Sequence, residues 1–271
     1  MDQLETFLDR CGSSFTYGTI GLAIGFLLFF LMERIFSLKP IKKPWRSYQL
    51  DLQYAFLSML YPPFIYFIIS AIFGLMALHL KGSSHNPHIS VLSFAVQLVI
   101  VLFVRDCLIY LRHRIFHTRP VWAFHSIHHS SEEVNWLSAA RFHPAENLIE
   151  TGLESLLFLG CAFIGVDASV LSVTSLLIGF YNLFIHSNLR WTFGPLRYVL
   201  VSPVFHRWHH SDLPEAQDKN FAAMFSCIDL ALGTFYMPMN NMPDTTGLST
   251  QEKTVHPRTL AGQLWYPFRK R

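Results

Sequence analysis

The sequence predicts an all-α integral membrane protein with about four transmembrane helices and a histidine-rich cap on the cytoplasmic side. Three observations support this fold class. Hydrophobic residues make up 51% of the 271 residues, charged residues only 14%, and phenylalanine alone occurs 25 times, a composition typical of polytopic membrane proteins. Apolar runs of bilayer-crossing length recur along the chain. Ten of the fourteen histidines lie between His113 and His210.

The remaining composition excludes several other classes of protein. The formal net charge of +3 is too small to indicate a nucleic-acid partner, and the basic residues cluster beside apolar runs. The four cysteines, Cys11, Cys107, Cys161 and Cys227, form no C-x-x-C pair. They therefore predict neither a disulfide framework nor a cysteine-based zinc site, and leave the redox compartment undecided.

Residues 1–88 form the predicted N-terminal region, with two membrane crossings. The apolar run 17–36 has the length of a transmembrane helix. Its basic residues follow it, whereas a cleaved signal peptide carries them in front. The basic loop 39–46 is therefore expected in the cytoplasm by the positive-inside rule. The second run, 52–80, contains Pro62-Pro63, which predicts a kink.

Residues 89–240 form the predicted histidine-rich domain. The run 89–104 returns to the cytoplasm and continues through Arg105, Asp106 and Arg112 into His113. A charge so close to an apolar helix needs a partner, so Asp106 either belongs to an ion pair that anchors the helix end or supports the histidine site. The runs 153–166 and 168–185 predict a helical hairpin that enters the membrane and brings His186 back to the other histidines.

The C-terminal part is expected outside the bilayer. Residues 220–237 are semi-apolar but are interrupted by Asp229 and Gly233, which favours an interfacial helix over a fifth crossing. Residues 241–271 form a polar tail whose last three residues are basic, which suits the cytoplasm.

Eight of the histidines fall into three clusters at helical spacing. Residues three and four apart share one face of a helix, so each cluster predicts a clamp of imidazoles. Eight or more converging imidazoles exceed the four ligands of one zinc ion, so the pattern predicts two metal ions. Four isolated histidines (His79, His85, His88 and His256) have no clustered partner and are left out. The clusters are His113 and His117; His125, His128 and His129; and His206, His209 and His210.

The position of the clusters indicates the chemistry. Neutral imidazole binds zinc, copper, iron and nickel, so the ligand type does not name the metal. Because the clusters begin where membrane helices end, a lipid with an unactivated C–H bond is the expected substrate. Paired ferrous ions can make the necessary oxidant from dioxygen, whereas zinc has no redox chemistry. A di-iron oxygenase is therefore the first hypothesis.

Three alternatives remain open at this point. A zinc-dependent membrane hydrolase would normally place a carboxylate among the histidines, as in H-E-x-x-H, and none of the clusters has one. A structural zinc site would usually recruit cysteine. A membrane protein that stores or transports metal would carry its ligands along the crossing helices.

The motifs HRIFH, HSIHH, RFHPAEN, FIHSN and HRWHH, in this order, resemble those of the fatty acid hydroxylase/sterol desaturase superfamily. The resemblance extends from about residue 90 to 240. It implies a helical transmembrane scaffold whose cytoplasmic, histidine-bound di-iron centre uses dioxygen and external electrons to hydroxylate or desaturate lipids; zinc would be a substituted metal. The chain has no His-Pro-Gly-Gly haem motif, so a separate reductase, ferredoxin or cytochrome b5-type protein is the expected electron donor.

The resemblance also assigns residues. It makes 89–240 the catalytic domain, the eight clustered histidines metal ligands, and His186 the extra ligand that follows the membrane hairpin. His143 is either a further ligand or a structural residue that begins a helix before Pro144.

Further residues are assigned supporting roles by the same resemblance. Glu146 and Asn188 look like groups that orient imidazoles, with helix capping as the alternative. Trp136 and Trp208 are candidates for the lining of the lipid path, although interfacial tryptophans need no such role.

The substrate is less defined. The segment 220–229 keeps Asn220 and Asp229 but lacks the glycine or tryptophan that the family often has there. Sterol, fatty acyl, ether-lipid, ceramide-like and carotenoid substrates all remain open. Hydroxylation is expected before desaturation, because radical rebound follows hydrogen abstraction by default. The lack of a C-terminal retrieval signal suits a bacterial inner membrane.

Overall fold

The computed structural model describes residues 20, 23–25, 27–40, 45–60, 92–239 and 241–269. The start of the predicted run 17–36, most of the run 52–80 with its Pro62-Pro63 kink, the linker that follows, and the last two residues lie outside the described part. Within it the chain is helical, and the only β interactions are two isolated bridges, Ser37 with Leu189 and Ser211 with Thr246.

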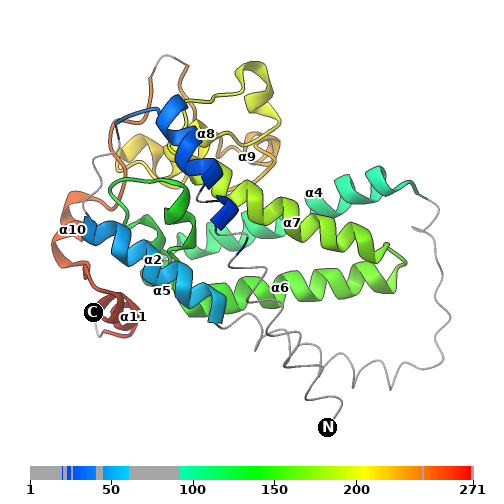
Figure 1. Cartoon of the computed structure of the whole chain (residues 1–271), viewed down its shortest axis with the longest axis horizontal. Coiled ribbons are helices and arrows are strands. Elements are labelled where there is room, and N and C mark those ends of the chain that lie inside the picture. Colours follow the sequence, from blue (N-terminus) through cyan, green and yellow to red (C-terminus); the bar gives the residue numbers. More distant parts are fainter. Residues whose placement is uncertain are drawn as a thin grey trace, which may run out of the picture.

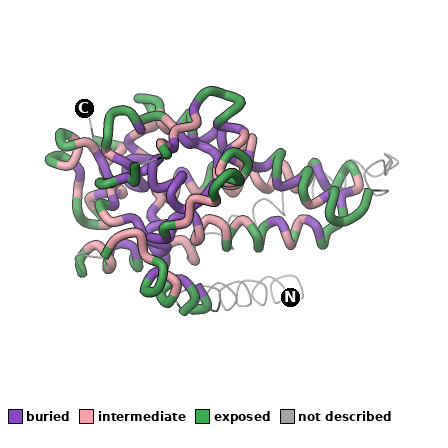
Figure 2. The backbone as a smooth tube through the Cα atoms, turned by 90° about the horizontal axis from the view of Figure 1, so that it is seen from above, coloured by how far each residue is buried: buried purple, intermediate pink, exposed green. Residues whose placement is uncertain are grey.

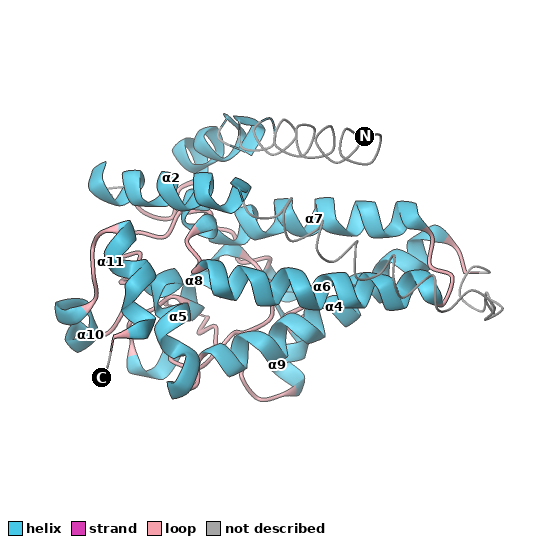
Figure 3. Ribbon diagram, turned by 90° about the horizontal axis from the view of Figure 1, so that it is seen from below, coloured by secondary structure: helices cyan, strands magenta, loops and turns pink. Residues whose placement is uncertain are grey.

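Three long helices extend from a cap built of short ones (Figure 1). They are α4 (Phe94–Phe116), α6 (Pro144–Phe163) and α7 (Ala168–His186). Helix α4 packs against both others, and the turn between α6 and α7 lies at the end of the molecule away from the cap (Figure 3). Helix α2 (Trp45–Leu60) lies beside the cap and contacts α11 and η1.

The cap consists of short helices and 3₁₀ turns joined by loops. Several of them begin with proline in the first turn, where its missing N–H leaves no donor unsatisfied. The α-helices are α5 (Arg119–His129), α8 (Pro203–His209), α9 (Cys227–Ala231), α10 (Thr250–Val255) and α11 (Leu260–Trp265). The 3₁₀ turns are η1 (Trp136–Ala140), η2 (Gly194–Tyr198), η3 (Pro214–Ala216) and η4 (Tyr266–Phe268).

Two of the described helices, α4 and α7, are long and apolar enough to cross a membrane. The predicted hairpin is present as α6 and α7. Asp167 between them is the N-cap of α7, where its carboxylate accepts a hydrogen bond from the Ser169 N–H (2.8 Å). Helix α4 continues without a break from the apolar run to the first histidines, so one rigid element joins the two regions.

The predicted interfacial helix over 220–237 is wrong. Only the five residues of α9 are α-helical there. Asn220 adopts a left-handed backbone conformation (φ 60°), and the amides that follow it donate to buried carboxylates instead of to helix carbonyls. The semi-apolar character of this segment reflects burial in the cap.

Burial is distributed differently in the two parts of the molecule. Buried residues gather in the cap, while the long helices alternate buried and exposed positions (Figure 2). Apolar side chains such as Val99, Leu156 and Leu176 are 58%, 59% and 65% exposed, whereas the histidines of the cap are buried. Exposed apolar surface on long helices together with a polar interior indicates association with a membrane.

Candidate metal centre

Nine histidine side chains converge in the cap, in two adjacent groups. Within each group, the potential ligand nitrogens all lie within 4.8 Å of one another. The five-histidine group contains His113, His117, His125, His129 and His209. The four-histidine group contains His128, His186, His206 and His210. His186 comes from the end of α7, so the hairpin does return it to the clusters.

The sequence clusters do not act as separate clamps, because two of them divide between the groups. On α5, His125 and His129 are one turn apart and face the five-histidine group. His128 is rotated by about 100° from His129, as 3.6 residues per turn requires, and faces the four-histidine group. The last cluster divides in the opposite sense: His206 and His210 join the four-histidine group and His209 the five-histidine group.

The loop 218–221 orients three rings of the five-histidine group. Each ring directs Nδ1 to an oxygen of this loop, which turns Nε2 towards the centre of the group. Such outer hydrogen bonds fix the tautomer and the orientation of a metal-binding imidazole. The contacts are His117 Nδ1 to Asp218 Oδ1 (3.1 Å), His209 Nδ1 to Lys219 O (2.8 Å) and His113 Nδ1 to Phe221 O (2.8 Å).

Two buried carboxylates hold this loop through five consecutive backbone N–H groups. Asp229 accepts hydrogen bonds from Phe221 and Ala222 (2.8 and 2.9 Å), and Asp106 accepts from the next three residues (2.9, 3.0 and 2.6 Å). Burial raises the pKa of Asp229 to about 6, and these hydrogen bonds oppose the rise. Asp106 therefore supports the site by fixing the loop, and among the described residues it contacts neither an imidazole nor an ion-pair partner at the helix end.

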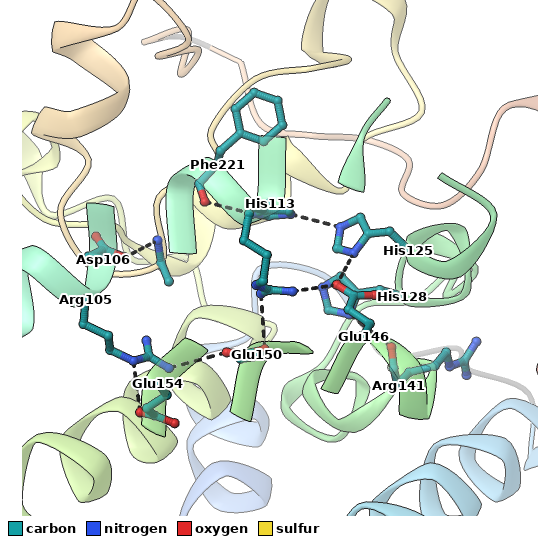
Figure 4. Close-up of polar contacts among 12 residues, drawn as sticks. Arg105, Asp106, His113, His125, His128, Arg141, Glu146, Glu150, Glu154 and Phe221 are labelled. Carbon is teal, nitrogen blue, oxygen red and sulfur yellow. Dashed lines mark hydrogen bonds and ion pairs between the residues drawn. The ribbon is translucent and has the colours of Figure 1, made fainter. Parts of the chain in front are cut away.

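Glu146 orients a fourth ring. Its Oε1 lies 2.8 Å from His125 Nδ1, as Figure 4 shows for this pair of residues. The same oxygen lies 2.9 Å from Arg112 Nη1. Burial raises the pKa of Glu146 to about 8, and the guanidinium of Arg112 acts in the opposite direction. A cation held by His125 would lower this pKa further. The prediction that Glu146 orients an imidazole agrees with this geometry.

The imidazoles are kept in the form that binds metals. Burial lowers the pKa values of seven of them well below the ordinary value, and neighbouring imidazoles lower them further. These rings are therefore neutral at neutral pH, with a lone pair available for a metal. They are His113, His125, His128, His129, His206, His209 and His210.

Facing lone pairs provide a test of whether the site suits a metal. His113 and His125 both direct Nδ1 to an acceptor oxygen, so both Nε2 atoms carry lone pairs, yet these atoms lie 3.0 Å apart. His128 and His186 repeat the pattern, with Nδ1 directed to carbonyl oxygens and Nε2 atoms 3.1 Å apart. Two acceptors at this distance repel unless a cation lies between them. Metal–nitrogen bonds of about 2.1 Å at right angles separate the nitrogens by roughly 3 Å, so both groups fit a metal ion.

His143 does not belong to either group, which corrects its assignment as a ligand. Its Nδ1 accepts a hydrogen bond from the Ala145 N–H (3.0 Å) as the N-cap of α6, and its Nε2 lies 3.2 Å from Leu264 O. Both ring nitrogens are engaged and no lone pair is left for a metal. The structure thus favours the helix-start alternative.

Asn188 does not orient an imidazole either. Its side-chain amide donates to Lys39 O (2.7 Å), and its backbone N–H donates to the buried Glu33 carboxylate (2.8 Å). Asn188 therefore joins the end of α7 to the N-terminal region. Asn188 lies two residues after His186 in the sequence, but its side chain contacts Lys39 of the N-terminal region.

A cavity of about 430 Å³ opens beside the histidines. It reaches both groups, through His113, His125, His128, His186 and His206. Trp136 and Trp208 are not among the described residues that line it: Trp136 packs on Phe29, and Trp208 packs on Tyr236. The prediction that these tryptophans line the lipid path is wrong, since both are core residues.

The sequence indicated that the charges of α4 need partners, but it did not identify the carboxylates along this cavity that pair with them. Arg105 and Arg112 of α4 form ion pairs with Glu146, Glu150 and Glu154 of α6. The signal was present in the spacing, because the three glutamates recur every four residues along an otherwise apolar helix and so share one face.

Comparison with known proteins identifies the family. The sequence profile of the family described as fatty acid hydroxylase matches residues 98–234, about half of the chain. The chain belongs to the fatty acid hydroxylase family. The matched region runs from within α4 to Thr234, beyond α9, and contains all nine converging histidines together with His143.

Relatives of this fatty acid hydroxylase family member act on lipids. The chain is 30% identical over 179 residues to the ornithine lipid hydroxylase OlsE of Rhizobium tropici. This matched region covers 65% of this chain and 52% of that protein. It is 32% identical over 159 residues to the alkylglycerol monooxygenase of Caenorhabditis elegans (58% of this chain, 30% of that protein). The human alkylglycerol monooxygenase is 32% identical over 124 residues (45% and 27%).

The matched regions span about half, or less, of these relatives' own lengths. No solved structure is significantly similar to the chain. The family is described as fatty acid hydroxylase, and these relatives are named as a hydroxylase and monooxygenases.

Proposed function

We propose that the protein is a membrane-bound, dioxygen-dependent di-iron lipid hydroxylase. The observation that carries this proposal is the convergence of nine neutral imidazoles in two groups that open onto one cavity. The names of the relatives favour hydroxylation over desaturation, since both ornithine lipid hydroxylase and alkylglycerol monooxygenase denote oxygen insertion. The lipid classes in those names are the first candidates for the substrate.

The proposed ligands are the eight clustered histidines and His186. Each group would hold one iron, and paired ferrous ions, when bound, supply the dioxygen activation that an unactivated C–H bond requires. The chain's own residues hold the imidazoles in place: Glu146 and the loop 218–221 fix the rings of the five-histidine group through Nδ1. The cavity holds the lipid beside both groups and keeps bulk water away from the reacting position.

The proposed topology has four crossings, with the cap on the cytoplasmic side. The end of α4 and the end of α7 both carry histidines to the cap, so the two apolar helices support a common face. The basic loop 39–46 and the basic C-terminus support the cytoplasmic side by the positive-inside rule. In this proposal residues 1–88 supply two crossings, 89–240 form the catalytic domain, 241–271 form a tail, and a separate protein supplies electrons.

Metal analysis and isotope incorporation test the proposal. Protein purified in detergent from iron-supplemented cells should contain about two irons per chain, with a spectroscopic signature of coupled ions. Lipid extracted after incubation with labelled dioxygen and a reductant should carry the label in a new hydroxyl group. Two zinc ions that resist exchange with iron, together with lipid hydrolysis that needs no dioxygen, would instead establish the zinc hydrolase.

A further inference from the structure

A row of charged side chains continues from the five-histidine group along the two apolar helices α4 and α6 (Figure 4). We call Glu146, Arg112, Glu150, Arg105 and Glu154 the charged row. It begins at His125, whose Nδ1 contacts Glu146 (2.8 Å). The further contacts are Arg112 to Glu146 (2.9 Å), Arg112 to Glu150 (3.2 Å), Arg105 to Glu150 (3.4 Å) and Arg105 to Glu154 (3.2 Å).

The charged row lies in surroundings that do not favour charge. Arg105 is near the middle of α4, one of the two described helices that are long and apolar enough to cross a membrane. A rise of about 1.5 Å per residue places it roughly 12 Å along the helix from His113. Ion pairs at such a depth are costly, and apolar residues could join the two helices equally well. A purely structural role therefore does not explain five ionisable side chains in succession.

The charged row forms one wall of the cavity. Arg105, Arg112, Glu150 and Glu154 all line it. The two carboxylates keep the larger exposed surface, 25% for Glu150 and 19% for Glu154, against 8% and 7% for the two guanidiniums. They can therefore accept further hydrogen bonds from a ligand in the cavity.

A second, largely apolar part of the wall is formed by Ala55 and Met59 of α2 and by Ile178, Gly179 and Leu183 of α7. A hydrocarbon chain alone would match this wall but would leave the exposed parts of the Glu150 and Glu154 carboxylates without a further hydrogen-bond partner. A ligand with both an acyl chain and a charged polar group matches both parts of the wall.

We propose that the cavity binds the zwitterionic polar group of a lipid, with Glu150 and Glu154 facing its ammonium group and Arg105 facing its anionic group. The polar group of the substrate then lies within about 12 Å of the histidines, measured along α4. The oxidised C–H bond is accordingly close to the polar group and not far along the acyl chain. This inference rests on the proposed function, because it places the substrate of that same site.

Binding of two chain-matched probes tests the inference. Nα-palmitoyl-lysine carries an ammonium and a carboxylate, whereas 1-monopalmitoylglycerol is polar but uncharged. Their affinities are measured for the metal-loaded protein in nanodiscs, without dioxygen or reductant. The zwitterionic probe should bind about tenfold more tightly, the magnitude of one charge-assisted hydrogen bond. Equal affinities would overturn the proposal.

Two substitutions locate the preference. Glu154→Gln keeps an acceptor for Arg105 but removes the charge, and should reduce the preference to nearly one. The matched control is Glu215→Gln, at an exposed position in η3, which should leave the preference unchanged. Metal content and melting temperature of both variants show whether they fold. A preference that survives Glu154→Gln in a folded protein would contradict the assigned role.

A third variant tests the cavity without touching the charged row. A Cβ on Gly179 would meet nothing within 4 Å, so Gly179→Phe should fold and fill the space. It should weaken both probes by a similar factor, and unchanged binding would mean that they bind elsewhere. Because no turnover is measured, the inference can fail while labelled oxygen still enters lipids. Conversely, the protein could contain zinc and incorporate no oxygen, and still prefer the zwitterionic probe. That result would refute only the proposed function.

Discussion

The two histidine groups are supported in different ways. In the five-histidine group, four rings direct Nδ1 to an oxygen outside the group, and three of these oxygens belong to the loop 218–221. In the four-histidine group, only His128 and His186 do so. The Nδ1 atoms of His206 and His210 are buried without a hydrogen-bond partner among the described residues.

This difference shows two ways to position a metal ligand. The four-histidine group relies on helices and packing: His186 bonds to the carbonyl one turn earlier in its own helix, and His128 stacks on Phe142 with ring centroids 4.0 Å apart. The five-histidine group relies on a loop that two buried carboxylates hold in place. The metal affinity of the two groups should therefore respond to different substitutions.

Removing one ligand from each group should have the largest effect. His128→Ala removes a ligand of the four-histidine group, and His209→Ala one of the five-histidine group. Each variant should lose activity and about one metal ion per chain, because the remaining imidazoles cannot complete the site. Metal analysis of the purified proteins, with circular dichroism for the fold, measures this.

The matched control for both variants is His143→Ala, which removes a buried histidine that lies outside both groups. It should keep the full metal content, although loss of the N-cap of α6 should destabilise the protein by about 1 kcal/mol. Full metal loading of His128→Ala or His209→Ala would contradict the ligand assignment.

Glu146→Gln should have the next largest effect, confined to the five-histidine group. The amide oxygen still accepts from His125, but the negative charge that favours a metal-bound imidazole is lost. Outer partners of this kind typically change metal affinity by about 10- to 100-fold. Competition with a chelator should show this loss for one metal ion and leave the other unchanged. Equal weakening at both ions would mean that Glu146 acts through the fold.

The unequal support also predicts two rates of metal loss. With excess chelator, the wild-type protein should release its metal ions in two phases that differ by about tenfold, the faster one from the four-histidine group. His128→Ala should lack the fast phase and His209→Ala the slow one. A single phase in the wild-type protein, or the opposite assignment, would show that packing supports a ligand as well as hydrogen bonds do.

Sequence reasoning predicted the convergence of the nine histidines because that signal is local. Spacing of three and four residues determines which imidazoles share a helix face, and apolar runs determine where the helices lead. It did not predict the division of His128 from His129, since the choice between two metal groups depends on what faces each side of α5.

The outer partners were harder to predict. Lys219, Phe221 and Arg141 contribute backbone carbonyl oxygens, and a carbonyl has no side-chain signature in a sequence. Asn188 was predicted to orient a ring only because it follows His186 closely, yet adjacency along the chain does not direct a side chain. The composition of 220–237 favoured a helix that does not form. Asn220 has a left-handed backbone conformation, and the backbone N–H groups after it donate to buried carboxylates instead of to helix carbonyls.

Asp229→Asn should have the smallest of these effects, again on one group only. The asparagine keeps one neutral acceptor oxygen, so one of the two backbone N–H groups, at Phe221 or Ala222, loses its acceptor and the other keeps an uncharged one. The carbonyl of Phe221 then moves relative to His113, so the metal affinity of the five-histidine group should fall about three- to tenfold. This loss corresponds to part of the free energy that a charge-assisted hydrogen bond contributes. Asp244→Asn, at a side chain that is 88% exposed, is the matched control. Because Asp229 touches no ring, a selective loss would show that the loop transmits its position to the imidazoles. A loss shared equally by both groups would show that the cap responds as a single packed unit, and the contrast between the two groups would then not hold.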